Sequence, residues 1–354
     1  MSLLKDVKFR PLRTILYPGV PTQTRDALPV TEVYQSLNIR MTGVVTTDPA
    51  VVPTGNTPEG ALSFIRRLVL EGSSNKRRAA YAQFKVGDVA AMYNLQRFLR
   101  NVAGVILNPA FAAAATPYPM SFDLQLDFEM PHTSDPRRTY LNAAEDLETL
   151  TAIIDWGDGT DVHVPGAAAT VASGGIVAQV VISGRELTDP NAKSFKYGVN
   201  TLSYQEIQVN AAVNNLEFNL RRGNLLRGVL IKAFCIDPVP IAVLVPATVA
   251  HTPVDDIILS ARFLLNRETK IDMFDWGTLQ GQNLIDFKMP ALIPGYAFID
   301  FMEDGNFNKI IPTNEFRDVT LQFNVQPSAL SVAPLTAISY IRVYPIEIYP
   351  AMQR

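Results

Sequence analysis

The segment SFDLQLDFEM, residues 121–130, alternates polar and apolar side chains at every position. Its apolar members lie two residues apart and are Phe122, Leu124, Leu126, Phe128 and Met130. Because successive side chains of a β-strand point to opposite faces of the sheet, this alternation predicts a strand with one buried and one solvated face. The segment DVTLQFNV, residues 318–325, repeats the pattern with Val319, Leu321, Phe323 and Val325 on its apolar face.

Similar segments follow one another from VYQSLNIRMTGVV, residues 33–45, to ISYIRVYPIEIYP, residues 338–350. Glycine, proline and asparagine separate them, which is typical of β-sandwiches with short strands. One segment differs, because GDVAAMYNLQRFLRNVAG, residues 87–104, brings Val89, Met92, Leu95 and Leu99 to one side at helical spacing. We therefore predict an all-β fold with one short helix in its first half, ending at Gly104 and covering the end or flank of a sandwich.

The two halves of the chain follow the same plan. Residues 64–95 and 258–285 each give an apolar strand with arginine, a charged turn, a second strand and then Val-Gly or Trp-Gly. In the same order, residues 124–131 correspond to 297–305, 139–157 to 310–326, and 177–189 to 340–350. Four weak matches in one order indicate two tandem domains of similar plan. The linker-like sequence TDPNAKSFKYG places the boundary near residues 188–200, giving domains over 28–190 and 191–354 after a short N-terminal segment.

Composition bounds the function. The chain has 354 residues, of which 47% are hydrophobic and 18% charged, with a net charge of -3, so it is globular and we expect no specific nucleic acid partner. The single cysteine, Cys235, lies in an apolar run and leaves no intrachain disulfide or thiolate metal cluster. No apolar stretch approaches the ~20 residues of a membrane span, and Met1–Lys8 is too short and too charged for a signal peptide. We expect synthesis and assembly in a cytoplasm.

No catalytic motif is evident: the sequence contains no GxSxG, P-loop, GxGxxG or HExxH. The three histidines, His132, His163 and His251, are far apart in the chain. The adjacent carboxylates Asp255–Asp256 and Glu145–Asp146 would point to opposite faces of a strand, which suits an acid and base pair poorly. We predict that the chain is not an enzyme and needs no cofactor, with a hydrolase on a jelly-roll scaffold as the enzymatic alternative.

Two successive sandwiches over nearly the whole chain resemble the double jelly-roll major capsid proteins of tailless, membrane-containing double-stranded DNA phages, the tectivirus-like lineage. The resemblance rests on NLEFNLRRGNLLRGVLIKAF (residues 215–234), on PGYAFIDFMEDGNFNKIIPTNEFRDVTLQFNV (294–325) and on PRRTYLNAAEDLETLTAIIDWGDGTDV (136–162). It implies two jelly rolls per chain, homotrimers that form pseudo-hexagonal capsomers, and an icosahedral virion shell around an internal membrane. Implied partners are further copies of the chain, penton and minor capsid proteins, and the internal viral membrane.

The N-terminal segment, residues 1–27, mixes basic and apolar side chains. Its basic residues include Lys5, Lys8, Arg10 and Arg13, among Leu3, Leu4, Phe9 and Leu12. In a capsid subunit this composition suits an arm that contacts a neighbouring subunit or the anionic membrane surface. The alternative interpretation is an ordinary terminal strand.

The segment IIDWGDGTD, residues 153–161, allows three interpretations. Asp155, Asp158 and Asp161 lie at i, i+3 and i+6, which does not match an EF-hand, but a weak cation site linked to assembly is one hypothesis. Resemblance to a Trp-x-x-Gly-Asp-Gly turn of immunoglobulin-like surface domains makes a secreted or surface adhesion protein the alternative to the capsid function. We favour the third interpretation, the end of a strand followed by a tight turn at Gly157 and Gly159. A minor capsid or spike protein is a further alternative.

Overall fold

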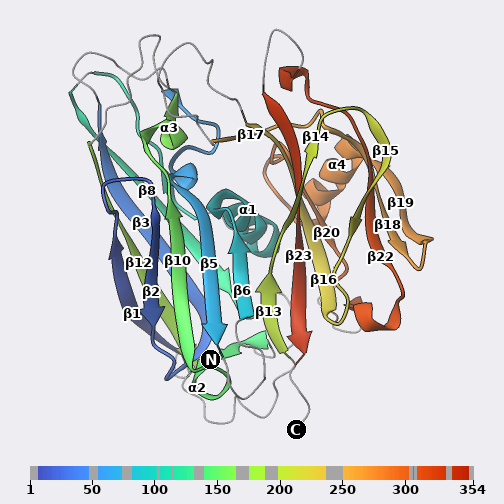
Figure 1. Cartoon of the computed structure of the whole chain (residues 1–354), viewed down its shortest axis with the longest axis horizontal. Coiled ribbons are helices and arrows are strands. Elements are labelled where there is room, and N and C mark those ends of the chain that lie inside the picture. Colours follow the sequence, from blue (N-terminus) through green and yellow to red (C-terminus); the bar gives the residue numbers. More distant parts are fainter. Residues whose placement is uncertain are drawn as a thin grey trace.

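The structure is a computed structural model that describes residues 7–47, 55–73, 82–101, 104–113, 115–130, 139–164, 175–187, 198–236, 250–302, 306, 309–331 and 337–350. Figure 1 shows two β-sandwiches side by side, with helix α1 (Val89–Arg100) between them. Their strands run in the same general direction. Within the described residues, no helix is long and apolar enough to cross a membrane.

The first sandwich consists of two antiparallel sheets. We call the first of them sheet A; its strands, in spatial order, are β1 (Val7–Leu16), β12 (Ile176–Leu187), β3 (Val33–Thr46), β8 (Pro117–Asp127) and β7 (Ile106–Leu107), and β9 (Leu141–Asn142) also pairs with β3. The facing sheet has the order β2 (Gln23–Leu28), β10 (Thr149–Trp156), β5 (Ile65–Ser73) and β6 (Ala82–Gly87). The remaining short elements are β4 (Gly55–Asn56), the 3-10 helix η1 (Gly60–Phe64), α2 (Ala143–Asp146), α3 (Gly159–Val162) and β11 (His163–Val164).

The second sandwich has the same organisation. One sheet has the order β14 (Gln205–Val209), β23 (Ile338–Pro350), β16 (Leu225–Ile236) and β20 (Tyr296–Asp300), with β17 (His251–Pro253) and β21 (Ile311–Pro312) also paired to β16. The other sheet has the order β15 (Val213–Asn219), β22 (Val319–Val325), β18 (Ile258–Leu265) and β19 (Glu268–Asp275). Its helices are α4 (Trp276–Asp286), η5 (Thr313–Glu315) and η6 (Ala329–Ser331).

The strand order identifies both sandwiches as jelly rolls. If the eight long strands of each are lettered B to I along the chain, both sandwiches have one sheet in the order B-I-D-G and one in the order C-H-E-F. The first series is β1, β2, β3, β5, β6, β8, β10 and β12, and the second is β14, β15, β16, β18, β19, β20, β22 and β23. The predicted all-β double jelly roll is confirmed. The immunoglobulin-like alternative is wrong, because that fold groups its strands as ABED and CFG.

Strand β13 (Gly198–Leu202) connects the two jelly rolls. It pairs antiparallel with β23 of the second jelly roll, and Leu202 pairs in parallel with Lys85 on β6 of the first. The C-H-E-F sheet of the first jelly roll and the B-I-D-G sheet of the second therefore form one 11-stranded sheet. The predicted boundary between residues 190 and 191 lies outside the described residues and stays a prediction.

Each jelly roll buries the apolar face that its strands present inward. Phe122, Leu124 and Leu126 of β8 face the first core, and the four predicted apolar residues of β22 face the second. The solvated face predicted for residues 318–325 is wrong at Thr320 and Gln322, which are buried. The neighbouring strand β15 of the same sheet provides their hydrogen-bond partners, since Thr320 donates to Asn219 and Gln322 donates to Glu217.

Helix α1 confirms the predicted helix, and it ends four residues before Gly104, at Arg100, because Asn101 adopts the left-handed conformation of a C-cap. The sequence prediction missed α4, which occupies the same place in the second jelly roll. Asp88 caps α1 and Asp275 caps α4. Eight residues after each cap, an amide side chain forms hydrogen bonds with the backbone of strand G, which is β8 in the first jelly roll and β20 in the second. Gln96 accepts from the Gln125 amide of β8, and Asn283 bonds both the amide and the carbonyl of Phe298 on β20. The two helices thus occupy equivalent places. The predicted match of Val86-Gly87 with Trp276-Gly277 is wrong, because Gly87 precedes the cap of α1 whereas Trp276 and Gly277 follow the cap of α4.

The predicted N-terminal arm over residues 1–27 is wrong for its described part. Residues 7–16 form β1, paired with β12, and residues 23–28 form β2, paired with β10. Arg10 binds Glu186 of β12 at 2.9 Å, and Arg13 binds Asp26 of β2 at 2.6 Å, so these basic side chains belong to the first jelly roll. Lys8 is exposed on β1, and Lys5 lies outside the described residues.

Candidate functional site: the charged contact between the jelly rolls

The outer face of the B-I-D-G sheet in the second jelly roll packs against the first jelly roll. Side chains alternate along β16, so that Val229 and Ile231 face the second core while Leu230 belongs to the core cluster of the first jelly roll. The same cluster takes Phe298 from β20 and Ile346 from β23. The contact between the two domains is therefore a continuous apolar core, and a group of buried charges lies at one end of it.

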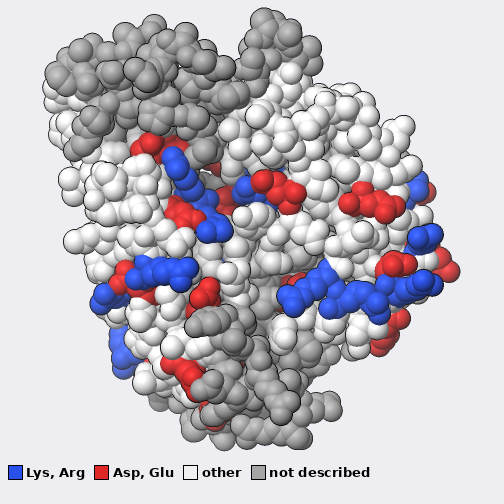
Figure 2. All heavy atoms as spheres, in the orientation of Figure 1, with Lys and Arg blue, Asp and Glu red and all other residues white. Residues whose placement is uncertain are grey.

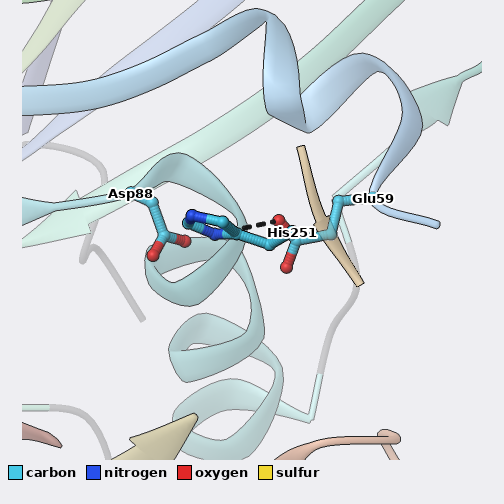
Figure 3. A group of neighbouring side chains, drawn as sticks. All are labelled: Glu59, Asp88 and His251. Atoms are coloured by element: carbon cyan, nitrogen blue, oxygen red, sulfur yellow. Dashed lines mark ion pairs between the residues drawn. The ribbon is translucent and has the colours of Figure 1, made fainter. Parts of the chain in front are cut away.

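The two jelly rolls contribute opposite charges to this group, which we call the interdomain ion cluster: Glu59, Asp88, Lys232, His251 and Arg342. Both carboxylates come from the first jelly roll, Glu59 just before η1 and Asp88 at the start of α1. The basic side chains come from the second, on β16, β17 and β23. Figure 3 shows the imidazole of His251 between the carboxylates of Glu59 and Asp88.

Lys232 is the centre of the interdomain ion cluster and is fully buried. Its Nζ lies 2.7 Å from Glu59 Oε1, 3.3 Å from Asp88 Oδ1 and 2.8 Å from His251 Nδ1. Because an ammonium group can only donate, His251 Nδ1 must be the acceptor, so the imidazole is neutral. These three contacts use all three protons of the ammonium.

Other side chains complete the polar contacts. Arg342 Nη1 lies 2.7 Å from Asp88 Oδ2, and the same guanidinium also pairs with Glu206 of β14. The hydroxyl of Tyr344 donates to Asp88, and that of Tyr296 donates to Glu59 Oε1 at 2.7 Å. A buried charge is tolerated only when it is paired and hydrogen-bonded, and both carboxylates meet this requirement.

The pKa values reflect burial and these neighbours. Burial on its own raises the pKa of Asp88, but Lys232 and Arg342 outweigh it and hold that pKa below its usual range. For Glu59 burial is the stronger effect, and its pKa is raised although Lys232 opposes the shift. Burial, and then the adjacent Lys232, lower the pKa of His251 well below its usual value. Asp88 is therefore the permanent anion of the cluster, whereas Glu59 accepts a proton more readily.

Glu59, Asp88 and His251 also have the composition of a metal site, since one ligand atom from each lies within 4.8 Å of the others. The ammonium of Lys232, however, is within hydrogen-bonding distance of all three side chains. The cation that these three side chains surround is thus the ammonium group of Lys232. The arrangement is that of a structural ion cluster, which fixes one jelly roll against the other.

A cavity of about 320 Å³ lies beside the cluster and is lined by both jelly rolls. Figure 2 shows blue and red side chains close together in this region. The charged and aromatic residues of its wall include Glu59, Arg66, Arg67, Asp88, Asp155, Tyr204, His251 and Arg342. Within the wall, Arg67 Nε lies 2.6 Å from Asp155 Oδ2, and the Arg342 guanidinium lies over the ring of Tyr204.

The aspartates of IIDWGDGTD face two arginines of β5: Asp155 pairs with Arg67, and Asp158 and Asp161 both pair with Arg66. Asp155 at the end of β10 faces Arg67, Asp158 caps α3, and the buried Asp161 binds Arg66 at 2.9 Å and accepts from the amide of Asp158. Trp156 is buried and donates to Thr24 of β2. These contacts favour the interpretation as a strand end and turn. The cation hypothesis for Asp155, Asp158 and Asp161 is untested.

Sequence reasoning missed the interdomain ion cluster. Of its members, the sequence predictions considered only His251, as one of three histidines that lie far apart in the chain. Lys232 was the available signal, because a lysine inside the apolar run GVLIKAFCI needs a buried anion. The partners cannot be identified from the sequence, because they lie far apart along the chain; Asp88 and Lys232, for example, are 144 residues apart.

Two complete jelly rolls in one chain define the double jelly-roll fold. No family model matches the sequence, and no curated protein matches it. Among solved structures, the chain is similar to the major capsid protein of Sulfolobus turreted icosahedral virus, with 13% identity, a TM-score of 0.67, and coverage of 98% of this chain and 97% of that chain. It is similar to the major capsid protein P2 of bacteriophage PM2, with 12% identity, a TM-score of 0.59, and coverage of 98% and 100%. The Faustovirus major capsid protein has 9% identity, a TM-score of 0.59, and coverage of 97% and 90%.

The chain therefore has the fold of the major capsid proteins of icosahedral viruses, as the sequence predicted. These structural neighbours are coat proteins and not enzymes. They come from viruses other than phages as well, so the fold alone does not assign the chain to a phage.

Proposed function

We propose that the chain is the major capsid protein of an icosahedral virus and acts as a homotrimer. One observation carries the proposal: the two jelly rolls match capsid proteins over 97–98% of this chain and 90–100% of theirs, with no domain left over for another activity in the matched region. Three chains with two similar jelly rolls each supply six similar walls, which is the requirement for a capsomer of pseudo-hexagonal outline.

The interdomain ion cluster supports this function physically. A shell subunit contacts neighbours on opposite sides, so its two domains need a fixed relative orientation. The shared 11-stranded sheet and the buried Lys232 contacts provide that orientation. A polar group buried in an interface favours one arrangement over others, because any other arrangement leaves its charges unpaired.

Capsomers of this kind are proposed to tile a shell over an internal membrane, with penton and minor capsid proteins as further partners. The exposed Lys8 on β1 and the preceding Lys5 are candidate contacts to anionic lipid. Vesicles of anionic and of neutral lipid test this part separately. Binding of the wild type to anionic vesicles only, lost in a Lys5→Glu/Lys8→Glu variant, supports membrane contact, and equal binding by both proteins refutes it.

Negative-stain microscopy of the purified chain tests the main proposal. We expect particles with a hexagonal outline and threefold symmetry. Particles the size of one chain, at concentrations where capsid proteins assemble, would overturn it.

A further inference from the structure

The cavity between the two jelly rolls opens at the surface beside the interdomain ion cluster. Its volume of about 320 Å³ falls within the range of small-molecule sites, roughly 300–1,000 Å³. Figure 2 shows the surface hollowed at this level, with blue side chains on both sides of the hollow. A cavity of this size where two domains meet is a common place for a ligand, and its wall shows which ligand fits.

The carboxylates of the wall are already bonded within the protein. Glu59 and Asp88 belong to the interdomain ion cluster, where each accepts from the ammonium of Lys232 and from a tyrosine hydroxyl. Their side chains are only 6% and 5% exposed. Asp155 accepts from two further side chains, one at each of its oxygens. Each acidic group of the wall therefore already has at least two donors, and little of its charge faces the cavity.

The guanidinium groups on the side of the first jelly roll, in contrast, keep donors for a ligand. Arg66 binds Asp161 through Nε and Nη2. Arg67 binds Asp155 through Nε alone. Because a guanidinium donates through all of its nitrogens, Arg66 Nη1 and the two amino groups of Arg67 are left for other contacts among the described residues. These side chains are 33% and 41% exposed, so the accessible charge on this side of the cavity is positive.

The second jelly roll contributes His251 and Arg342 to the wall. Nδ1 of His251 accepts from Lys232, so the ring proton lies on Nε2, which donates. Arg342 adds positive charge, and its guanidinium carbon lies 4.7 Å from the centroid of the Tyr204 ring. Tyr204 also contacts Arg67. This ring therefore joins an arginine of one jelly roll to an arginine of the other across the cavity.

We propose that this cavity binds a phosphate group between the two jelly rolls. Arg66 and Arg67 donate to its oxygens from the first jelly roll. His251 donates through Nε2 from the second, and Arg342 adds positive charge there. Guanidinium groups match phosphate oxygens in both geometry and charge. A tetrahedral anion has acceptors in several directions, so it meets donors from both sides of the cavity at once, whereas a planar carboxylate meets one side. The inference goes beyond the capsid function and does not depend on it.

Such a ligand adds a further contact between the domains. A phosphate bonded to both Arg67 and His251 requires the jelly rolls to be docked against each other, so it stabilises the docked arrangement by mass action. It also supplies an acceptor for the Nε2 proton of His251. Binding should therefore raise the melting temperature of the chain in a way that depends on phosphate concentration.

Isothermal titration calorimetry and thermal unfolding of the full chain with inorganic phosphate test the proposal. The pH is kept near neutral and the ionic strength is kept constant, with chloride replacing phosphate. We expect saturable binding of a single phosphate per chain and a melting temperature that rises as phosphate is added.

Arg67→Gln is the test variant, and Arg13→Gln is its matched control. Both arginines pair with an aspartate at 2.6 Å, and they are 41% and 53% exposed, but of the two only Arg67 lines the cavity. Each change removes an exposed ion pair, so without phosphate both variants should melt close to the wild type. We expect Arg67→Gln to weaken phosphate binding by at least about 10-fold, as loss of a charge-assisted hydrogen bond does, and Arg13→Gln to bind phosphate as the wild type does.

A nucleoside monophosphate and the matching nucleoside distinguish the two sources of a phosphate group, the inorganic ion and a phosphate ester. Binding of inorganic phosphate but not of the monophosphate assigns the cavity to the ion. Binding of both, without binding of the nucleoside, assigns it to phosphate esters as well. A wild type that shows no saturable binding of inorganic phosphate overturns the proposal, and so does an Arg67→Gln variant that binds phosphate as tightly as the wild type. Either of these results leaves the capsid function standing.

Discussion

Replacing Lys232 with methionine tests the role of the interdomain ion cluster. The change keeps most of the apolar stem and removes a buried ammonium that contacts Glu59, Asp88 and His251. Asp88 retains Arg342 and Tyr344, whereas Glu59 retains the hydroxyl of Tyr296 and a longer contact of 3.7 Å with His251 Nδ1. The destabilisation therefore falls mainly on Glu59.

Removing one partner of a buried ion pair costs about 3–5 kcal/mol, and we expect Lys232→Met to lower the free energy of unfolding by that amount at neutral pH. A second change, Glu59→Gln, removes the unpaired charge. The double variant should therefore recover a large part of the loss. Denaturant unfolding followed by far-UV circular dichroism measures these differences.

Lys270→Met is the matched control, because Lys270 forms an exposed pair with Glu268 and such pairs contribute at most about 1 kcal/mol. The reasoning is refuted if Lys232→Met costs no more than Lys270→Met. It is also refuted if the double variant is less stable than Lys232→Met, since Glu59 would then not be the stranded charge.

Three further predictions concern other buried polar groups. The pKa of His251 is lowered in the folded protein, so below about pH 6.5, the usual pKa of histidine, the unfolded chain binds more protons than the folded protein. Stability should therefore fall as the pH drops below about 6.5, and His251→Gln should flatten this part of a pH–stability curve. An unchanged slope would contradict the lowered pKa of His251. Burial lowers the pKa of Lys85 to about 7, so the stability of the wild type should rise from pH 7 to pH 10. Lys85→Met should be more stable than the wild type at pH 7, and this difference in stability should shrink toward pH 10. A difference that does not change with pH would show that Lys85 is not desolvated in the folded protein. Asn283→Ala should cost about 1–3 kcal/mol in denaturant unfolding because it strands two buried backbone groups of Phe298, and Gln96→Ala should cost less because Gln96 makes one such bond; equal losses would refute this comparison.

The alternation of polar and apolar residues predicted those strands in which one face is buried and the other is exposed. Strands β8 and β10 show this alternation, and the order of equivalent segments located the two jelly rolls. Strand β16 does not alternate, because one of its faces lies in the second core and the other against the first jelly roll. The arm interpretation failed at β1 for a related reason: a register shift between Pro11 and Arg13 breaks the alternation, so the strand reads as irregular.

The interdomain ion cluster was beyond sequence reasoning for a different reason. Glu59 and Asp88 precede helical turns, where carboxylates are common as caps, and nothing local distinguishes them from surface groups. Their burial results from the packing of the second jelly roll against α1, which depends on the relative position of two domains. Helix α4 was missed because its exposed Gly277, Gln282 and Ile285 give it a weak amphipathic pattern in the isolated chain.

The native mass of the purified wild-type chain tests the central claim most directly. We expect a trimer of three times 39.0 kDa that forms without any other protein. A stable monomer of 39.0 kDa across the micromolar range would contradict it.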